Sequence, residues 1–211
     1  MKRLLFFILI SIASNNFLLA QTEKFGTWVE LEFTKTFLEK FEFSIIPEFR
    51  FQDDFTMDKY QFDAKLAYEP FKFLELAAAY RIKTNIKDKG DEVTHRIVLD
   101  AKFSKDFDRF ETSFRTRFTT YNNIDNDGKT TMIRPRFKVG YDIRGNKLFP
   151  FVSYELFQSL SENELKKGRF TIGVSRKIGE IHRIAIYYGL QHYYIDDQTI
   201  NILGIDYRLK F

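Results

Sequence analysis

His192 stands at the end of an alternating, strand-like segment, and two aspartates, Asp196 and Asp197, follow it closely. An imidazole titrates near neutral pH, so a histidine oriented by a carboxylate can take a proton from water and act as a general base. That chemistry would make the protein a hydrolase, such as a lipid deacylase, a phospholipase or a protease. We therefore keep these three residues as a candidate catalytic group, although loop aspartates near a strand-end histidine are common.

Other motifs that would support catalysis are missing from the sequence. It has no Gly-x-Ser-x-Gly elbow, no glycine-rich phosphate loop and no cysteine, and its three histidines lack zinc-ligand spacing. Asn123, Asp125 and Asp127 resemble part of a calcium loop, but the downstream glutamate that would complete it is missing. We expect neither a cofactor nor a metal, and an enzyme is the less favoured interpretation.

The charged residues follow a more regular pattern than the histidines. The segment Phe41–Phe51, FEFSIIPEFRF, places Phe, Ile and Pro at every second position, and Glu42, Glu48 and Arg50 lie between them. Successive side chains of a β-strand point to opposite faces, so this segment has one apolar face and one largely charged face. The same period of two recurs along the chain, and no convincing helical period follows residue 20.

Eleven segments show this alternation, and most are about ten residues long. A tilted strand needs about 9–11 residues to cross a bilayer, so the segment length suits a membrane-spanning strand. The segments are residues 28–37, 41–51, 60–68, 74–83, 94–103, 109–121, 132–143, 149–157, 168–178, 183–193 and 201–211.

The lengths of the connections and the positions of the aromatic residues also follow a regular pattern along the chain. Short connections alternate with longer polar ones, which is typical of a transmembrane barrel with short turns on one rim and longer loops on the other. Aromatic residues near both segment ends predict two interfacial belts. One belt would contain Phe37, Phe41, Phe71, Phe73, Phe107, Phe149 and Phe151, and the other Trp28, Phe51, Tyr60, Tyr80, Tyr121, Tyr193 and Tyr194.

The first twenty residues have the order of a secretory signal. Lys2 and Arg3 precede the apolar run Leu4–Ile10, and a weaker apolar stretch ends at Ala20. We predict that residues 1–20 are a cleaved signal peptide and that residues 21–211 form a single domain. Without the signal the formal net charge falls from +4 to +2, which gives no reason to expect nucleic-acid binding.

Two resemblances identify the class of barrel. The last segment, which alternates apolar residues up to Tyr207, Leu209 and a terminal Phe211, resembles the carboxy-terminal signal that the insertion machinery of bacterial outer membranes reads. Residues from Trp28 onward resemble a family of small bacterial outer-membrane β-barrel proteins of unknown function, of the Bacteroidetes type. The features that carry this resemblance are Trp28, Glu48 with Arg50, Arg115 with Arg117, Arg134 with Arg136, and the stretch Tyr154–Phe157.

These resemblances imply an exported protein of the bacterial outer membrane, in contact with membrane lipid and with the barrel-insertion machinery. The expected fold is all-β, an antiparallel up-and-down transmembrane β-barrel. Bacterial barrels of one chain have an even strand number, whereas the sequence shows eleven segments. We therefore predict twelve strands, with ten as the alternative, and expect residues 21–26 to add a short strand or to thread the lumen.

In such a barrel the apolar face meets lipid and the charged face lines the interior. The first four strands would supply an acidic wall, and the fifth to seventh strands would supply a basic wall. The acidic wall consists of Glu30, Glu32, Glu42, Glu48, Asp63, Glu69 and Glu75, and the basic wall of Arg96, Lys102, Arg115, Arg117, Arg134, Arg136 and Lys138.

Walls of opposite charge facing each other across water predict a narrow, porin-like channel for small hydrophilic solutes. The arginines would favour anions through bidentate contacts with carboxylate or phosphate. One alternative is a closed, salt-bridged structural or binding barrel without conductance, because ten to twelve strands lie between filled eight-stranded barrels and open porins. The hydrolase at the rim is the other alternative.

Overall fold

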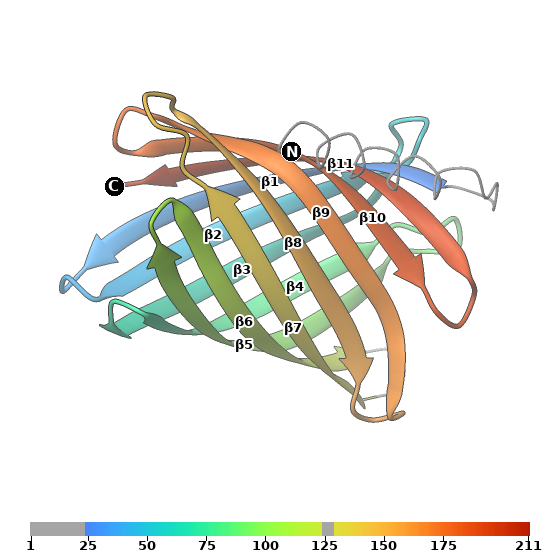
Figure 1. Cartoon of the computed structure of the whole chain (residues 1–211). Helices are drawn as coiled ribbons and strands as arrows, with labels where there is room; N and C mark the ends of the chain where they lie inside the picture. The colour runs from blue at the N-terminus through green and yellow to red at the C-terminus, as the bar shows by residue number, and fades with distance from the viewer. Residues whose placement is uncertain (1–23, 124–128) are drawn as a thin grey trace.

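In the computed structural model, which describes residues 24–123 and 129–211, the chain forms a closed β-barrel of tilted strands (Figure 1). The described residues contain eleven strands. They are β1 (Lys24–Phe37), β2 (Phe41–Phe51), β3 (Met57–Phe71), β4 (Leu74–Asn85), β5 (Glu92–Phe107), β6 (Phe110–Asn123), β7 (Lys129–Tyr141), β8 (Leu148–Ser159), β9 (Glu164–Ile178), β10 (His182–Tyr193) and β11 (Gln198–Lys210).

The first and last strands close the barrel. Every strand pairs antiparallel with its neighbour along the chain, whereas β1 and β11 pair in parallel, from Lys24 opposite Ile200 to Thr34 opposite Lys210. The prediction of twelve strands, or of ten, is therefore wrong for the described residues, because a parallel ladder lets an odd number of strands close. Lys24–Gly26 form the start of β1, whereas the predicted signal peptide lies outside the described residues.

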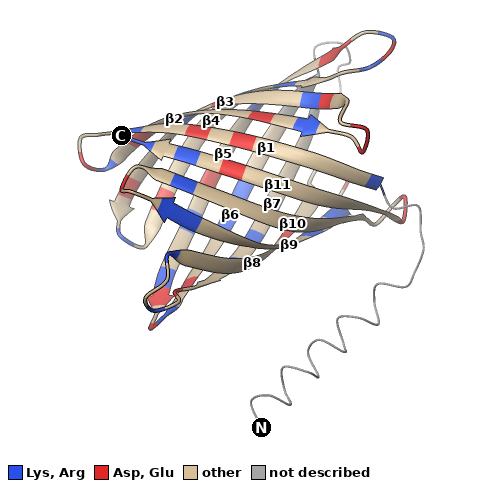
Figure 2. Ribbon diagram, turned by 90° about the horizontal axis from the view of Figure 1, so that it is seen from above, with Lys and Arg blue, Asp and Glu red and all other residues tan. Residues whose placement is uncertain are grey.

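The two faces of the sheet have opposite polarity, as the alternation predicts. Large apolar side chains on the outer face are exposed, for example Ile97 at 55% and Phe137 at 53%, whereas charged side chains on the inner face are buried, with Arg81 at 6% and Glu155 at 4%. Figure 2 shows acidic and basic residues along the strands as well as in the turns. Water-soluble proteins place these residue classes the other way round.

Connection lengths differ between the two rims less than the sequence indicates. We call the end where β1 begins the N-terminal rim and the end where β11 finishes the C-terminal rim. Described connections at the N-terminal rim have four to six residues, and those at the C-terminal rim have two or three, except for the six residues 142–147. The strands extend up to 16 residues and absorb much of the predicted loops, so strand pairing continues beyond the alternating segments.

Four of the residues assigned to aromatic belts face the interior instead. Trp28, Phe149, Phe151 and Tyr193 line the cavity of the barrel. The outer face does carry aromatic contacts near the C-terminal rim, where the rings of Phe37 and Phe41 and those of Phe71 and Phe73 are stacked. The side chain of Tyr121 lies outside the described residues.

A close contact with the Tyr187 ring constrains the packing of β9, β10 and β11. Gly204 on β11 pairs with Tyr187 on β10, and a Cβ atom at Gly204 would lie 1.9 Å from the Tyr187 ring. A Cβ atom at Gly173 on β9 would lie 2.6 Å from the Tyr187 Cβ atom. The tyrosine side chain therefore occupies the space that two glycines on the flanking strands leave open.

We predict that Gly204→Ala destabilises the folded barrel by about 1–3 kcal/mol, because the new methyl group overlaps the ring. Gly189→Ala is the matched control, since its Cβ atom would meet its nearest neighbour, Ile202, at an ordinary 3.4 Å. The measurement is the urea concentration at which the folded band disappears from unheated gels. Equal midpoints for the two variants would show that the ring contact does not contribute to stability.

Candidate functional site in the barrel lumen

A cavity of about 990 Å³ fills the interior of the barrel, and all eleven strands contribute to its lining. It extends from Lys166 and Asp196 near the N-terminal rim to Asp106 and Glu111 near the C-terminal rim. The lining is dominated by ionisable side chains. The lumen is therefore the candidate functional site of the barrel.

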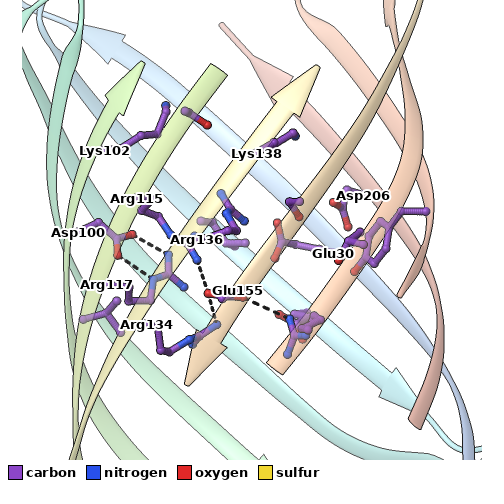
Figure 3. Close-up of a pocket in the computed structure, with 18 of the residues that line it drawn as sticks. Glu30, Asp100, Lys102, Arg115, Arg117, Arg134, Arg136, Lys138, Glu155 and Asp206 are labelled. Atoms are coloured by element: carbon purple, nitrogen blue, oxygen red, sulfur yellow. Dashed lines mark hydrogen bonds and ion pairs between the residues drawn. The ribbon is translucent and has the colours of Figure 1, made fainter. Parts of the chain in front are cut away.

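Three arginines converge on one buried carboxylate in this cavity (Figure 3). The Glu155 Oε1 atom on β8 lies 2.6 Å from a guanidinium nitrogen of Arg115 on β6 and 3.0 Å from one of Arg134 on β7. Its Oε2 atom lies 3.8 Å from Arg169 on β9. We call these four residues the Glu155 cluster. It holds three positive charges and one negative charge, so the cluster is positive overall.

The arginines of the cluster retain unused donors. The Nε atoms of Arg115 and Arg134 are buried and have no hydrogen-bond partner in the described part of the chain. Arg169 is better satisfied, because it donates to the Gln191 side-chain oxygen from two nitrogens at 3.0 and 2.6 Å. Buried donors normally find a partner, so two unpaired Nε atoms are unusual for a protein interior.

A second group of ion pairs joins neighbouring strands along the wall. Arg81 binds Asp63 through two hydrogen bonds, and Arg117 binds Asp100 in the same bidentate way, at 2.5–2.7 Å. In both cases the partners stand directly opposite each other in adjacent strands. Lys102 with Glu75 and Arg208 with Glu32 add two further pairs of adjacent strands, at 2.6 and 2.5 Å. These pairs neutralise wall charges locally, so they do not bridge the lumen.

Trp28 on β1 connects more distant parts of the wall. The guanidinium carbon of Arg50 on β2 lies 3.8 Å from the centre of a Trp28 ring, and that of Arg169 on β9 lies 4.5 Å away. Arg50 also pairs with Glu48 on its own strand. Two cations therefore contact one aromatic side chain, and the contact with Arg169 passes over β10 and β11.

Several charged residues lining the cavity stay outside these pairs, and four of them form two groups. Glu30 on β1 stands beside Asp206 on β11, and we call them the acid pair. Arg136 and Lys138 lie two positions apart on β7, and we call them the basic pair. Figure 3 shows the two pairs on different sides of the cavity. In residues 24–123 and 129–211 none of the four forms a hydrogen bond or an ion pair, although Lys138 lies 3.9 Å from the centre of the Phe151 ring.

The predicted walls map unevenly onto the cavity. All seven residues of the basic wall line it, whereas Glu42 and Glu69 of the acidic wall do not. Glu42 pairs with Lys210 at the C-terminal rim, and Glu69 is exposed. The sequence interpretation missed Glu155, Arg169, Asp206 and Arg208, because it compared the walls only over the first seven strands. Their positions opposite the apolar residues of the last four strands would have revealed them.

Only one of the two candidate aspartates, Asp197, lies close to His192. His192 lies on the outer face of β10, where its Nδ1 atom is 3.2 Å from the Thr199 hydroxyl and its Nε2 atom is 3.7 Å from an Asp197 oxygen. Asp196 lines the cavity instead. The His95 and His182 rings contact the hydroxyls of Tyr80 and Tyr207. Over the described ranges no three His, Cys, Asp or Glu residues are grouped so that they could hold a metal ion.

Residues 25–201 match the model of a family described as a protein of unknown function, DUF2490. The chain belongs to the DUF2490 family. This confirms the resemblance to an uncharacterised barrel family, and the match covers the DUF2490 barrel from β1 to the start of β11. No curated protein matches the chain. Among the described residues no helix has the length and the apolar character of a membrane span.

We predict that Glu155→Gln destabilises the DUF2490 barrel by about 3–5 kcal/mol, because it leaves buried arginines without their counter-charge. Glu111→Gln is the control, since this exposed glutamate lies near the C-terminal rim. Urea unfolding followed by tryptophan fluorescence measures both. If Glu155→Gln prevents folding, adding Arg134→Met should restore it by removing one of the unpaired charges. Failure of that rescue, or equal stability of the two single variants, would contradict this account of the cluster.

Proposed function

We propose that this DUF2490 protein is an outer-membrane barrel that conducts small hydrophilic solutes and prefers anions. The observation that carries the proposal is the charged cavity whose lining residues extend from one rim to the other. A barrel filled only for stability has no need of a continuous polar space along its axis.

Membrane location is supported by the inverted distribution of residues. The outer face exposes apolar side chains around the barrel, including Phe62 at 44%, Phe103 at 49%, Ile172 at 50% and Ile186 at 50%. An apolar surface of this extent is unfavourable in water and favourable in lipid. The closed sheet pairs the edges that hydrocarbon could not solvate, which is the second requirement for a spanning β-structure.

The cavity volume sets the size of the solute. Spread over the roughly 30 Å of a bilayer core, a volume of 990 Å³ corresponds to a mean cross-section of about 33 Å². That cross-section suits ions and small organic molecules, and it is narrow enough for every solute to pass close to charged side chains. Selectivity by charge follows from that proximity.

The preference for anions comes from the balance of the lining residues. Sixteen lysines and arginines and eleven aspartates and glutamates line the cavity, which is an excess of five positive charges. The guanidinium groups of Arg115 and Arg134 line the same cavity. Guanidinium groups bind carboxylates and phosphates more specifically than ammonium groups do, so organic anions are the favoured class.

A closed barrel is the second candidate, and a specific observation favours it. The contact between Trp28 and Arg169 and the convergence of three strands on Glu155 bring side chains together inside the lumen. If these contacts persist in the membrane, they block passage, and the barrel acts as a rigid surface protein. The rim hydrolase lacks comparable support, because His192 does not line the cavity and Asp196 does, so only Asp197 is left beside the histidine.

We predict that the refolded protein forms stable ohmic channels in a planar bilayer and that its reversal potential in a KCl gradient indicates anion preference. Arg136→Glu should reduce the ratio of anion to cation permeability. A unit positive charge about 6 Å from the ion path stabilises an anion by about 0.7 kcal/mol in water and destabilises a cation by the same amount, so removing Arg136 lowers the ratio about tenfold, and the added carboxylate lowers it further.

Lys89→Glu serves as the control for this channel experiment, because Lys89 is an exposed loop residue outside the cavity lining. Its permeability ratio should equal that of the unmodified protein. Folding is verified by the mobility difference between heated and unheated samples. Folded protein that passes no current would rule out the channel and favour the closed barrel.

We predict that the N-terminal rim faces the cell exterior and the C-terminal rim the periplasm. The last residue, Phe211, bonds to the backbone of Thr34 at the C-terminal rim, where most turns are short. The chain has no cysteine, so single cysteines report their own location. A membrane-impermeant maleimide should label Lys89→Cys on intact cells and Glu180→Cys only after the outer membrane is opened. The reverse pattern would invert the orientation, and equal labelling of both would argue against insertion.

A further inference from the structure

The acid pair and the basic pair create an asymmetry inside the lumen that the wall ion pairs do not remove. Glu30 and Asp206 lie on the closing strands, and Arg136 and Lys138 lie on β7, which is separated from β11 by three strands. Both pairs line the same cavity. A solute in that space meets negative charge on one side and positive charge on the other.

The acid pair lacks a positive partner in the described part of the chain. Glu30 and Asp206 are in register in the parallel ladder between β1 and β11, so two carboxylates stand side by side on one face of the sheet. Adjacent like charges are unfavourable when no counter-charge is present. Neither carboxylate has an ion-pair partner in the described part of the chain. An ammonium group placed between them would satisfy both.

The basic pair has the complementary requirement. Arg136 and Lys138 are two positions apart, so both point to the inner face of β7 at a spacing of about 6–7 Å. Arg136 presents a planar fork of donors, which a carboxylate accepts in a bidentate arrangement. Lys138 lies over the Phe151 ring, which orients its ammonium group beside an apolar surface. A solute carboxylate would therefore meet two cations here.

One molecule that satisfies both pairs must carry an ammonium group and a carboxylate at a suitable separation. Charged atoms of the two pairs are more than 4.0 Å apart, so they do not neutralise each other directly. In a free amino acid the two charges are attached to the same carbon atom, whereas an extended dipeptide spans about 7 Å. The longer molecule can reach across a wider gap between the two pairs.

We propose that the lumen contains a binding site for short zwitterionic peptides, with the amino terminus at Glu30 and Asp206 and the carboxylate at Arg136 and Lys138. This inference rests on the proposed channel and specifies its substrate class. A simple anion would be attracted by the basic pair but repelled by the acid pair. A dipeptide with free ends is attracted by both, so it dwells longer in the lumen.

The test is the effect of alanyl-alanine on the ion current through single channels. The dipeptide should reduce the current in a saturable, concentration-dependent way. N-acetyl-alanyl-alanine, which lacks the ammonium group, and alanyl-alanine amide, which lacks the carboxylate, should block about tenfold less well. Equal block by the acetylated analogue would overturn the proposal, because the acid pair would then have no role in recognition.

Variants assign the two ends of the dipeptide. The double variant Glu30→Gln with Asp206→Asn should weaken the block by alanyl-alanine about tenfold or more but leave that by the acetylated analogue unchanged or stronger. Arg136→Gln should weaken the block by both molecules. The double variant Asp88→Asn with Asp91→Asn changes two exposed loop acids outside the cavity lining, so its block should match that of the unmodified protein. Unchanged block after neutralising the acid pair would also contradict the site.

Tryptophan fluorescence separates failure of this inference from failure of the channel. Trp28 is the only tryptophan of the protein, and it lines the cavity two positions from Glu30. Saturable fluorescence changes on adding alanyl-alanine to folded, detergent-solubilised protein would support the site even if no current is observed. A conducting barrel that shows neither a fluorescence change nor a block by the dipeptide would refute the site and leave the channel intact.

Discussion

Eleven Cα pairs between β1 and β11, from Lys24 with Ile200 to Thr34 with Lys210, close the sheet on itself. Closure satisfies the backbone groups of the first and last strands, which would otherwise form two exposed edges. It also divides the side chains of every strand between two separate environments. The exposed apolar belt, the charged interior and the cavity all follow from that division, because side chains of alternating polarity are separated into two environments only when one face is enclosed.

An enclosed charged face must then be neutralised from within. Pairs such as Asp63 with Arg81 and Asp100 with Arg117 do this between adjacent strands, and their bidentate geometry uses the carboxylate oxygens fully. The Glu155 cluster behaves differently, since one carboxylate faces three cations. The interior therefore combines locally neutral wall segments with regions of net charge. Those regions, rather than the ion pairs, give the lumen its chemical character.

Alternation in the sequence was sufficient to predict the fold class and the faces of most strands. Phe41–Phe51 shows why, because its apolar residues fall on one parity and Glu42, Glu48 and Arg50 on the other. The strand number was harder to predict, since closure by a parallel ladder leaves no local signal in β1 or β11. Trp28 and Phe149 were assigned to outer belts from their position near strand ends, although they share parity with Glu30 and Glu155. The parity of a residue within its strand was therefore a better guide to the face it occupies than its type or its position near a strand end.

Contacts inside the lumen depend on register, which the sequence does not state. Connection lengths and irregularities such as the register shift between Tyr68 and Phe71 decide which charges become neighbours. The acid pair illustrates this most directly. Glu30 and Asp206 are 176 residues apart, and they meet because an odd number of strands makes the closing ladder parallel. With an even number of strands, the first and last strands would run in opposite directions, and different residues would face each other across the closing ladder. The odd strand number, which the sequence interpretation rejected, therefore places two acidic residues side by side at the cavity.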